Sequence, residues 1–304
     1  MSETLALALF TLFVLLMLAL DLGVFQRRPH KLSFREAIGW YAFWVALAVA
    51  FNLGIYFWRG GQPALEFLTG YILEVSLSMD NVFVFAVIFA FLGVRGEFQH
   101  RVLFWGIVGA LVMRAAFIAA GVALVTRFHW LLYIFGAFLV VTGVRLFRQK
   151  HEEYNPERNP VMRLARRIFP ITPEYEGAKF FVVRDGRRMA TPLLLVLLLV
   201  ETTDVIFAVD SIPAVFSVTL DPFIVYTSNI FAILGLRSLY FVLAGAMRKF
   251  RYLRPGLSLV LIFVGIKMLA AEFYKIPILL SLGIISGILL VAILVSLRPE
   301  SPRT

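Results

Sequence analysis

The stretch EVSLSMDN at residues 74–81 has a counterpart, DVIFAVDS, at residues 204–211. Each stretch begins with an acidic residue followed by valine, and each ends with an aspartate followed by a short polar residue. A further acid, Glu201, precedes the second stretch by three positions. Both stretches lie inside long apolar runs, so the fold of this chain has to place carboxylates in apolar surroundings.

The composition indicates a polytopic membrane protein. Hydrophobic residues make up 61% of the 304 residues and charged residues 16%, whereas soluble domains are about 45–50% apolar and about 25% charged. We therefore expect an all-α fold, a polytopic membrane helix bundle that forms one integral membrane domain over residues 1–304. Cysteine is absent, which excludes disulfides, thiolate metal ligands and a cysteine nucleophile.

Apolar runs of about 20 residues, long enough to cross a bilayer, predict nine transmembrane helices. In chain order they cover residues 4–25, 37–58, 65–92, 102–125, 129–147, 191–213, 219–246, 253–273 and 277–297. Lys and Arg are concentrated in alternate loops, which fixes an orientation by the positive-inside rule. This pattern predicts an outside N-terminus and a cytoplasmic C-terminus. It also accounts for the net charge of +10 without nucleic acid as a partner.

The segment 148–190 is the one sizeable part expected outside the membrane, and it is strongly basic. NPVMRLARRIFP at 159–170 has the pattern of a short amphipathic helix that lies on the inner membrane surface. KFFVVRDGRRMAT at 179–191 has an Asp-Gly turn between apolar and basic residues, which predicts a hairpin. The basic excess of this cytoplasmic loop favours contact with anionic lipid.

The two acidic stretches are expected to cross the membrane in opposite directions. The span at 65–92 should run from outside to inside, and the span at 191–213 from inside to outside. Similar stretches of opposite polarity are typical of an inverted repeat, whose substrate site lies near the membrane midplane. The predicted repeat unit has three helices, so that the third to fifth spans recur as the sixth to eighth.

The mid-span acids outnumber the mid-span bases. Each ionised side chain at the bilayer centre costs about 2.5–3.5 kcal/mol. The acids are Glu74, Asp80, Glu201, Asp204 and Asp210, with Asp21 near the inner end of the first span as a sixth. The basic residues that could pair with them are Arg114, Arg237 and Lys267. The excess of acids favours a cation or proton site over ion pairing alone.

Helical geometry sorts the polar side chains into faces. Two sets each share one helix face at about 100° per residue: Glu74, Ser78 and Asn81 in one span, and Glu201, Asp204 and Ser211 in the other. Asp80 and Asp210 are turned about 100° away from the last member of each set, so a straight helix would not bring both acids of a stretch onto one ion. Pro213 could change this geometry, because it removes the hydrogen bond to the Val209 carbonyl and can break the helix there.

The available donor atoms indicate the class of ion. Carboxylate, amide and hydroxyl oxygens suit hard cations such as Mg²⁺, Ca²⁺ and Mn²⁺, whereas zinc and copper would recruit the His or Cys that these spans lack. Asn229 is polar enough to join the site, either as a ligand or through an interhelical hydrogen bond. The sequence has no phosphate-binding loop and no HExxH pattern, so we expect neither an ATP-driven pump nor an enzyme.

Five segments resemble the TerC family of bacterial integral membrane proteins, which includes the Alx branch and is grouped with the LysE-type transporters. They are LDLGVF at 20–25, EVSLSMDN at 74–81, ETTDVIFAVDSIPAVF at 201–216, TSNIFAILGLRSLYF at 227–241 and GIKML at 265–269. The resemblance implies nine spans in the bacterial cytoplasmic membrane and a role in metal-ion handling, chiefly Mn²⁺ efflux. It supports ten polar positions as functional: Asp21, Glu74, Asp80, Asn81, Glu201, Asp204, Asp210, Asn229, Arg237 and Lys267.

The resulting hypothesis is a secondary transporter that exports Mn²⁺ in exchange for protons, with Ca²⁺ or Mg²⁺ as alternative ions and no organic cofactor. The expected metal ligands, at the interface of the third and sixth spans, are Glu74, Asp80, Asn81, Glu201, Asp204 and Asp210. Supporting roles fall to Asp21, Ser78, Ser211, Arg114, Asn229, Arg237 and Lys267. Of these, Arg237 and Lys267 are expected to hold the empty site together as a replaceable positive charge. Two alternatives stay open: a non-transporting component that delivers metal or assists membrane-protein assembly, and a Ca²⁺/H⁺ exchanger.

Overall fold

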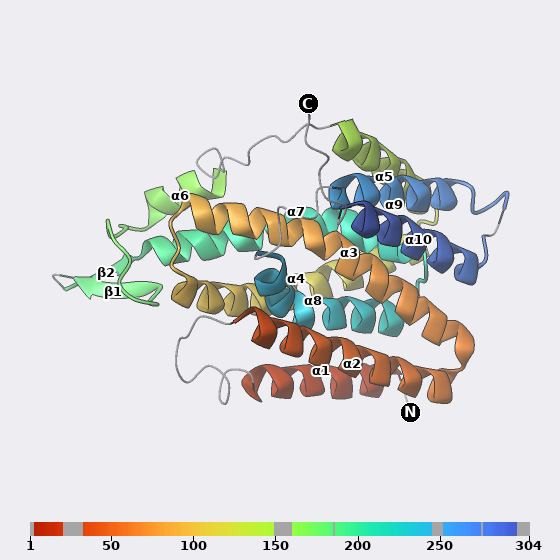
Figure 1. The fold of residues 1–304 in the computed structure, drawn as a ribbon, viewed down its shortest axis with the longest axis horizontal. Helices are drawn as coiled ribbons and strands as arrows, with labels where there is room; N and C mark the ends of the chain where they lie inside the picture. Colours follow the sequence, from red (N-terminus) through yellow and green to blue (C-terminus); the bar gives the residue numbers. More distant parts are fainter. Residues whose placement is uncertain are drawn as a thin grey trace.

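The computed structural model describes residues 3–20, 33–148, 160–184, 186–244, 252–274 and 276–296. Asp21 and the side chain of Asp80 lie outside the described part. Within it the chain is an all-α helix bundle with one small hairpin (Figure 1), as the composition predicts. Seven helices are long and apolar enough to cross a membrane: α2 (Phe34–Arg59), α3 (Gly61–Phe91), α4 (Gly96–Arg127), α5 (Leu131–Arg148), α7 (Pro192–Phe216), α8 (Pro222–Ala244) and α10 (Ile278–Ser296).

Two further helices coincide with predicted spans. Helix α1 (Glu3–Leu20) covers the first and is apolar over Leu5–Ala19. Helix α9 (Leu253–Leu269) covers the eighth, has 17 residues and carries a basic residue near each end. The multi-pass membrane fold is therefore confirmed by the seven long helices, while the count of nine spans stays a prediction.

Local sequence determines where several helices begin and reverse. Ser33 caps α2, because its hydroxyl accepts a hydrogen bond from the Glu36 amide at 3.3 Å. Gly60 separates α2 from α3 with a φ of +96°, a conformation that side chains with a Cβ rarely adopt. Thr191 caps α7, and Pro192 follows at a first-turn position where its missing N–H is not needed. These signals give a sharp reversal between α2 and α3 and a defined start for α7.

Pro213, which could have broken α7, does not interrupt it. Helix α7 continues through Pro213 and ends at Phe216. Proline removes one backbone hydrogen bond, but the loss falls in the last turn of the helix, where little helix remains to be disrupted. Residues 211–216 are all buried, so packing on both sides holds this turn in place.

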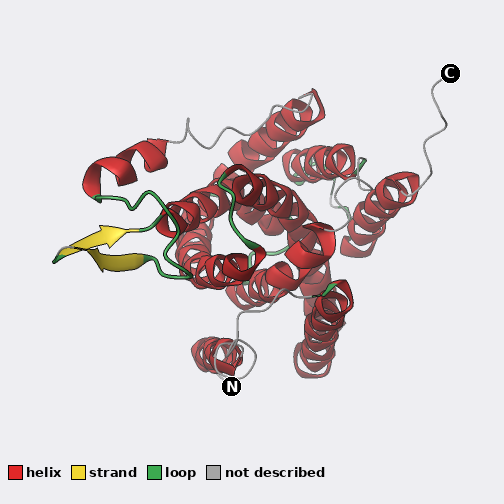
Figure 2. Ribbon diagram, turned by 60° about the vertical axis from the view of Figure 1, so that its left-hand side comes forward, coloured by secondary structure: helices red, strands yellow, loops and turns green. Residues whose placement is uncertain are grey.

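The segment between α5 and α7 contains a short helix and a hairpin. Helix α6 (Pro160–Ile168) is followed by the strands β1 (Phe181–Arg184) and β2 (Arg187–Ala190). The strands pair antiparallel, with Phe181 opposite Ala190. Figure 2 shows that the hairpin projects away from the bundle. The sheet therefore adds little to the core, which is made by the helices.

Helices α3, α4, α7 and α8 form the centre of the bundle. Helix α3 packs against α7 and α8, and α4 packs against the same two helices. Helix α8 is buried along most of its length, because α2 and α1 also cover it. The acidic stretches lie on α3 and α7, so their polar faces point into this centre rather than towards lipid.

Helices α5 and α9 form a separate close pair. A Cβ placed on Gly265 would lie 2.6 Å from the carbonyl oxygen of Gly136, and a Cβ placed on Gly136 would lie 3.0 Å from the carbonyl oxygen of Gly265. The two backbones therefore touch reciprocally at these glycines. This crossing requires residues without a side chain, as in other tightly packed membrane helices.

Candidate functional site: a buried carboxylate cluster around Arg114

Arg114 of α4 is the centre of the buried polar cluster. Its side chain is 1% exposed. Its Nη1 donates hydrogen bonds to Glu74 Oε1, to Asn229 Oδ1 at 2.6 Å and to Ser211 Oγ at 3.2 Å. Its Nη2 lies 3.6 Å from Asp204 Oδ1, which forms an ion pair without a hydrogen bond. Side chains of α3, α4, α7 and α8 therefore meet at one guanidinium.

The geometry of α7 explains how one arginine reaches two of its residues. Asp204 and Ser211 are seven positions apart, which is about two helical turns, and so they lie on one face. The guanidinium lies beside this face, with Nη2 towards Asp204 and Nη1 towards Ser211. Glu74 comes from α3 at the position that aligns with Asp204 in the two similar stretches. The aligned acids thus share one positive charge.

Six buried side-chain oxygens on α3 and α7 have no hydrogen-bond partner among the described residues. They are Glu74 Oε2, Ser78 Oγ, Asn81 Oδ1, Glu201 Oε2, Asp204 Oδ1 and Asp204 Oδ2. A buried acceptor without a donor costs about 1–3 kcal/mol, and more when it is charged. Most buried polar groups in folded proteins are paired. This concentration of acceptors without donors on two adjacent helices makes the region around them the candidate functional site.

Glu201 joins the cluster at the contact between α4 and α7. A Cβ placed on Gly109 of α4 would overlap the Glu201 carboxylate, so that carboxylate occupies the space that the glycine leaves open. Glu201 is one helical turn from Asp204 on α7 and shares its face. Sequence reasoning missed Gly109, because a glycine in an apolar span carries no sign of which side chain lies against it.

The structure assembles part of the predicted site. Glu74, Asp204, Ser211 and Asn229 meet around Arg114. The remaining predicted residues of the described part are Ser78 and Asn81, buried on the Glu74 face of α3, Glu201 beside Gly109, and Asp210, Arg237 and Lys267. No hydrogen bond or ion pair joins any of these to Arg114. The expected ligand roles of Asp80 and Asp21 fall on groups outside the described part.

One of the three basic residues expected as partners of the acids, Arg114, makes contacts with Glu74 and Asp204. The role of Arg237 and Lys267 as a replaceable positive charge stays a prediction. Lys267 on α9 forms no ion pair with a described side chain. All three basic residues lie within predicted spans, and it is the packing of α4 against α7 and α8 that brings Arg114 to this cluster. Among the described side chains, no three acidic or imidazole groups lie close enough together to hold a metal ion.

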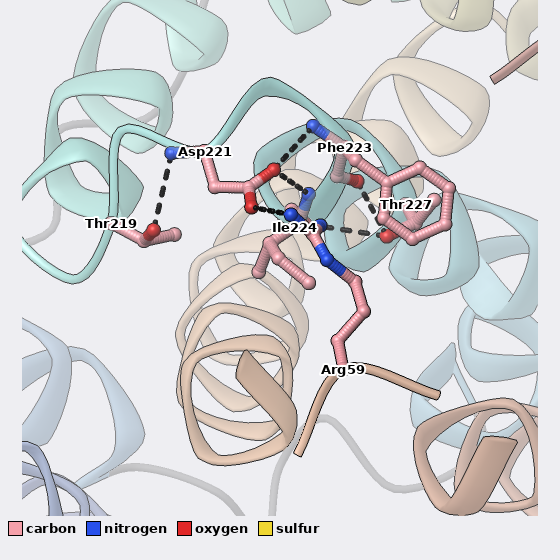
Figure 3. A network of polar contacts seen from close by, with 6 residues as sticks. All are labelled: Arg59, Thr219, Asp221, Phe223, Ile224 and Thr227. Carbon is pink, nitrogen blue, oxygen red and sulfur yellow. Dashed lines mark hydrogen bonds and ion pairs between the residues drawn. The ribbon is translucent and has the colours of Figure 1, made fainter. Parts of the chain in front are cut away.

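A second arginine–carboxylate network lies at the junction between α2 and α8 (Figure 3). Arg59 Nη2 lies 2.8 Å from Asp221 Oδ2. Asp221 Oδ1 accepts hydrogen bonds from the Phe223 amide at 2.9 Å and the Ile224 amide at 3.2 Å, and so caps α8. Both charged side chains are about one-fifth exposed, at 22% and 21%. This network fastens the end of α2 to the start of α8.

The loop segment before the hairpin is tied to the opposite end of the bundle. Tyr175 donates a hydrogen bond to the Leu92 carbonyl at 2.7 Å. Burial raises the pKa of the Tyr175 hydroxyl, which therefore stays protonated and able to donate at neutral pH. Nearby, Tyr240 donates to Gln99 Oε1 at 3.1 Å, which joins α8 to the start of α4. The first bond holds the loop against the end of α3, and the second holds two helices together at the same end of the bundle.

Comparison with known proteins gives a consistent result. The family model described as "Integral membrane protein TerC family" matches residues 59–303. The "Uncharacterized membrane protein STKORF319" of Myxococcus xanthus is 58% identical over 288 residues, covering 95% of this chain and 90% of that protein. Proteins named "Putative membrane-bound redox modulator Alx" are 47% identical in Salmonella typhi and 45% identical in Escherichia coli K12, each covering 94% of this chain and 92% of the relative. No solved structure matches the chain significantly.

Proposed function

Because this chain belongs to the TerC family of integral membrane proteins, we propose that it is a secondary transporter of divalent metal cations that exports Mn²⁺ in exchange for protons. The observation that carries the proposal is the set of six buried oxygens on α3 and α7 that have no hydrogen-bond donor among the described residues. A cation is the partner that such oxygens lack.

The charge of the described cluster fits a divalent ion. Glu74, Glu201 and Asp204 contribute three carboxylates to the buried centre, although they do not lie close enough together to hold one ion by themselves, and Arg114 contributes one guanidinium. Two negative charges are therefore left, and one divalent cation or two protons would neutralise them. Because burial disfavours the charged form of a carboxyl group, protons replace the ion when it leaves. This exchange couples metal export to proton entry.

The donor atoms favour a hard cation. Carboxylate, hydroxyl and amide oxygens suit Mn²⁺, Mg²⁺ and Ca²⁺. No histidine takes part in the Arg114 contacts. Asn81, on the same face of α3 as Glu74, extends the proposed ligand set along that helix. We place Mn²⁺ first because of the family resemblance, with Ca²⁺ and Mg²⁺ as the competing ions in the test.

The helix contacts support an inverted repeat around this site. If α3, α4 and α5 repeat as α7, α8 and α9, each helix packs against its own counterpart, in the pairs α3–α7, α4–α8 and α5–α9. The reciprocal contact of Gly136 with Gly265 joins the last of these pairs. Transporters with inverted repeats bind their substrate at the interface between the repeats. The Arg114 cluster lies at that interface in this proposal.

The predicted orientation places the segment between α5 and α7 on the cytoplasmic side of the membrane. With the N-terminus outside and the C-terminus in the cytoplasm, α6 lies at the inner surface of the bacterial cytoplasmic membrane. Met162 of α6 is buried, while Leu164 and Ile168 are exposed beside the exposed Arg163 and Arg167. Apolar side chains next to arginines are suited to the interface of an anionic leaflet. Anionic lipid is thus the proposed partner of this segment.

The name of the Alx relatives includes a redox role. The present sequence contains no cysteine, so no thiol–disulfide step can be written for it. We therefore favour ion transport as the primary activity. An effect on cellular redox state would follow from the metal content of the cell.

Metal binding and flux test the proposal. Full-length protein in proteoliposomes is expected to carry Mn²⁺ in the direction opposite to the protons when a proton gradient is imposed, and detergent-purified protein is expected to bind Mn²⁺. The double variant Glu74→Gln, Asp204→Asn is expected to lose both, because it removes two of the three described carboxylates. Glu66→Gln is the matched control, since Glu66 is a carboxylate of the same helix that bonds to Gln62 away from the cluster. Unchanged Mn²⁺ binding in the double variant would refute the site.

A further inference from the structure

The surroundings of Arg114 Nη1 are those of a bound cation. Three oxygens of different chemical types approach this one nitrogen: a carboxylate from Glu74, a hydroxyl from Ser211 and an amide carbonyl from Asn229. They come from three different helices, α3, α7 and α8. Hard metal ions in proteins are bound by oxygens of these same types. The positively charged nitrogen therefore stands where an ion would make its contacts.

The pairing of Arg114 is incomplete for a purely structural ion pair. A stable arginine–carboxylate pair usually has two parallel hydrogen bonds. Here Asp204 is 3.6 Å from Nη2, and Arg114 Nε has no hydrogen-bond partner among the described residues. Glu74 Oε2 also lacks a donor. An ion with closer contacts to several oxygens can compete with a guanidinium held in this way.

We infer that Arg114 is a tethered cation: it occupies the oxygen site when the transporter is empty and is displaced when the metal ion binds. This inference rests on the proposed function, and it assigns to Arg114 a positioning role in ion exchange. The metal and the guanidinium need the same Glu74, Ser211 and Asn229 oxygens, so they exclude each other. Like charges a few ångströms apart also repel.

When the metal ion displaces it, the Arg114 side chain can pair with Asp204. Asp204 lies beside Nη2, and both of its oxygens lack hydrogen bonds among the described residues. The guanidinium can therefore move towards Asp204 without leaving the protein interior. In the empty carrier Arg114 limits the uncompensated buried charge, and in the loaded carrier it weakens metal binding enough for release. Both effects favour turnover.

The variant Arg114→Gln tests this inference with metal binding to the whole protein. Removing the competing charge is expected to tighten Mn²⁺ binding by about tenfold or more, while net Mn²⁺ flux falls because release is slow. Arg114→Lys keeps a charge and is expected to restore part of the flux. Arg59→Gln, which removes an arginine outside the cluster, is expected to bind Mn²⁺ as the unmodified protein does.

The outcomes separate the inference from the proposed function. Unmodified protein that binds neither Mn²⁺, Ca²⁺ nor Mg²⁺ overturns the proposed function. Unmodified protein that binds Mn²⁺, together with an Arg114→Gln variant of equal or weaker affinity, overturns the tethered cation alone, because Arg114 would then build the site instead of filling it. If Arg114→Gln does not fold, Arg114→Lys decides the question. Its single ammonium should compete less well and give a smaller gain in affinity, and equal or weaker binding overturns the inference.

Discussion

Two arginines attach α8 to neighbouring helices, and they do so in opposite surroundings. Arg59 pairs with Asp221 at the start of α8, where both side chains are partly exposed and both Asp221 oxygens are used. Arg114 bonds to Asn229 within α8, where it is buried and faces carboxylate oxygens without donors. The first network is partly exposed to solvent, so its charges cost little to keep in place. The second is incomplete and costly, which marks it as the site where function is expected.

Removing each arginine tests this contrast most directly, and the largest effect is expected at Arg114. Arg114→Gln leaves Glu74 and Asp204 buried without their countercharge, and breaking such a buried pair lowers the free energy of unfolding by about 3–5 kcal/mol. Arg59→Gln removes a partly exposed pair, which contributes about 0–1 kcal/mol. Thermal unfolding of both variants in the same metal-free detergent solution measures the difference.

Added Mn²⁺ sharpens the same comparison. Since a ligand stabilises the folded state that binds it, Mn²⁺ is expected to restore much of the melting temperature that Arg114→Gln has lost. It should raise the melting temperature of Arg59→Gln no more than that of the unmodified protein. Equal losses of stability in the two variants, with equal responses to Mn²⁺, would remove the distinction between the two networks.

A pair of glycine substitutions gives the next largest effect. Gly109→Ala places a methyl group where the Glu201 carboxylate lies, so the carboxylate or the α4 backbone has to move. Overpacking of this kind costs about 1–3 kcal/mol, and we expect Mn²⁺ affinity to fall by about tenfold if Glu201 is a ligand. Isothermal titration of the purified variant measures this affinity.

Gly54→Ala is the matched control for Gly109→Ala. It lies in α2, another membrane-spanning helix, and a Cβ placed there meets no atom within 4 Å. Alanine favours a helix over glycine by about 0.5–1 kcal/mol, so stability should rise slightly and Mn²⁺ affinity should not change. A Gly109→Ala variant with normal affinity would show that the position of Glu201 does not matter for metal binding.

The sequence predicted the helices well because apolar run length and helix signals are local. Each of the nine predicted spans contains a helix in the structure. The boundaries were less accurate: the span predicted at 102–125 lies within a helix that runs from Gly96 to Arg127. Polar residues such as Gln99 and Arg101 end an apolar run without ending a helix, since their backbone amides continue the hydrogen-bond ladder.

The site was predictable in part. The alignment of Glu74 with Asp204 predicted that these acids act together, and they share Arg114. The sequence could not tell which base meets these two acids, because Arg114, Arg237 and Lys267 all lie within apolar spans. The placement of Glu201 against Gly109 likewise depends on how α4 and α7 meet. The position of each of these side chains depends on contacts between helices that are distant in the sequence. Such contacts leave no local pattern in a single sequence.

Changes at Asp221 have the smallest expected effect and test the other side of the comparison. Asp221→Ala removes the cap of α8 together with the partner of Arg59, so the free energy of unfolding should fall by about 1–2 kcal/mol. Asp221→Asn keeps a side-chain oxygen that can cap the helix and loses only the ion pair, so its loss should stay below about 1 kcal/mol.

Neither variant is expected to change Mn²⁺ affinity, because the Arg59–Asp221 ion pair between α2 and α8 is not part of the Arg114 cluster. Thermal unfolding and Mn²⁺ titration of the two variants, in parallel with the unmodified protein, check both statements. If Asp221→Asn keeps its stability but loses Mn²⁺ flux, the exposed network is part of the ion path. A partly exposed ion pair would then be as functional as the buried cluster, and buried oxygens without hydrogen-bond donors would no longer be the feature that locates the site.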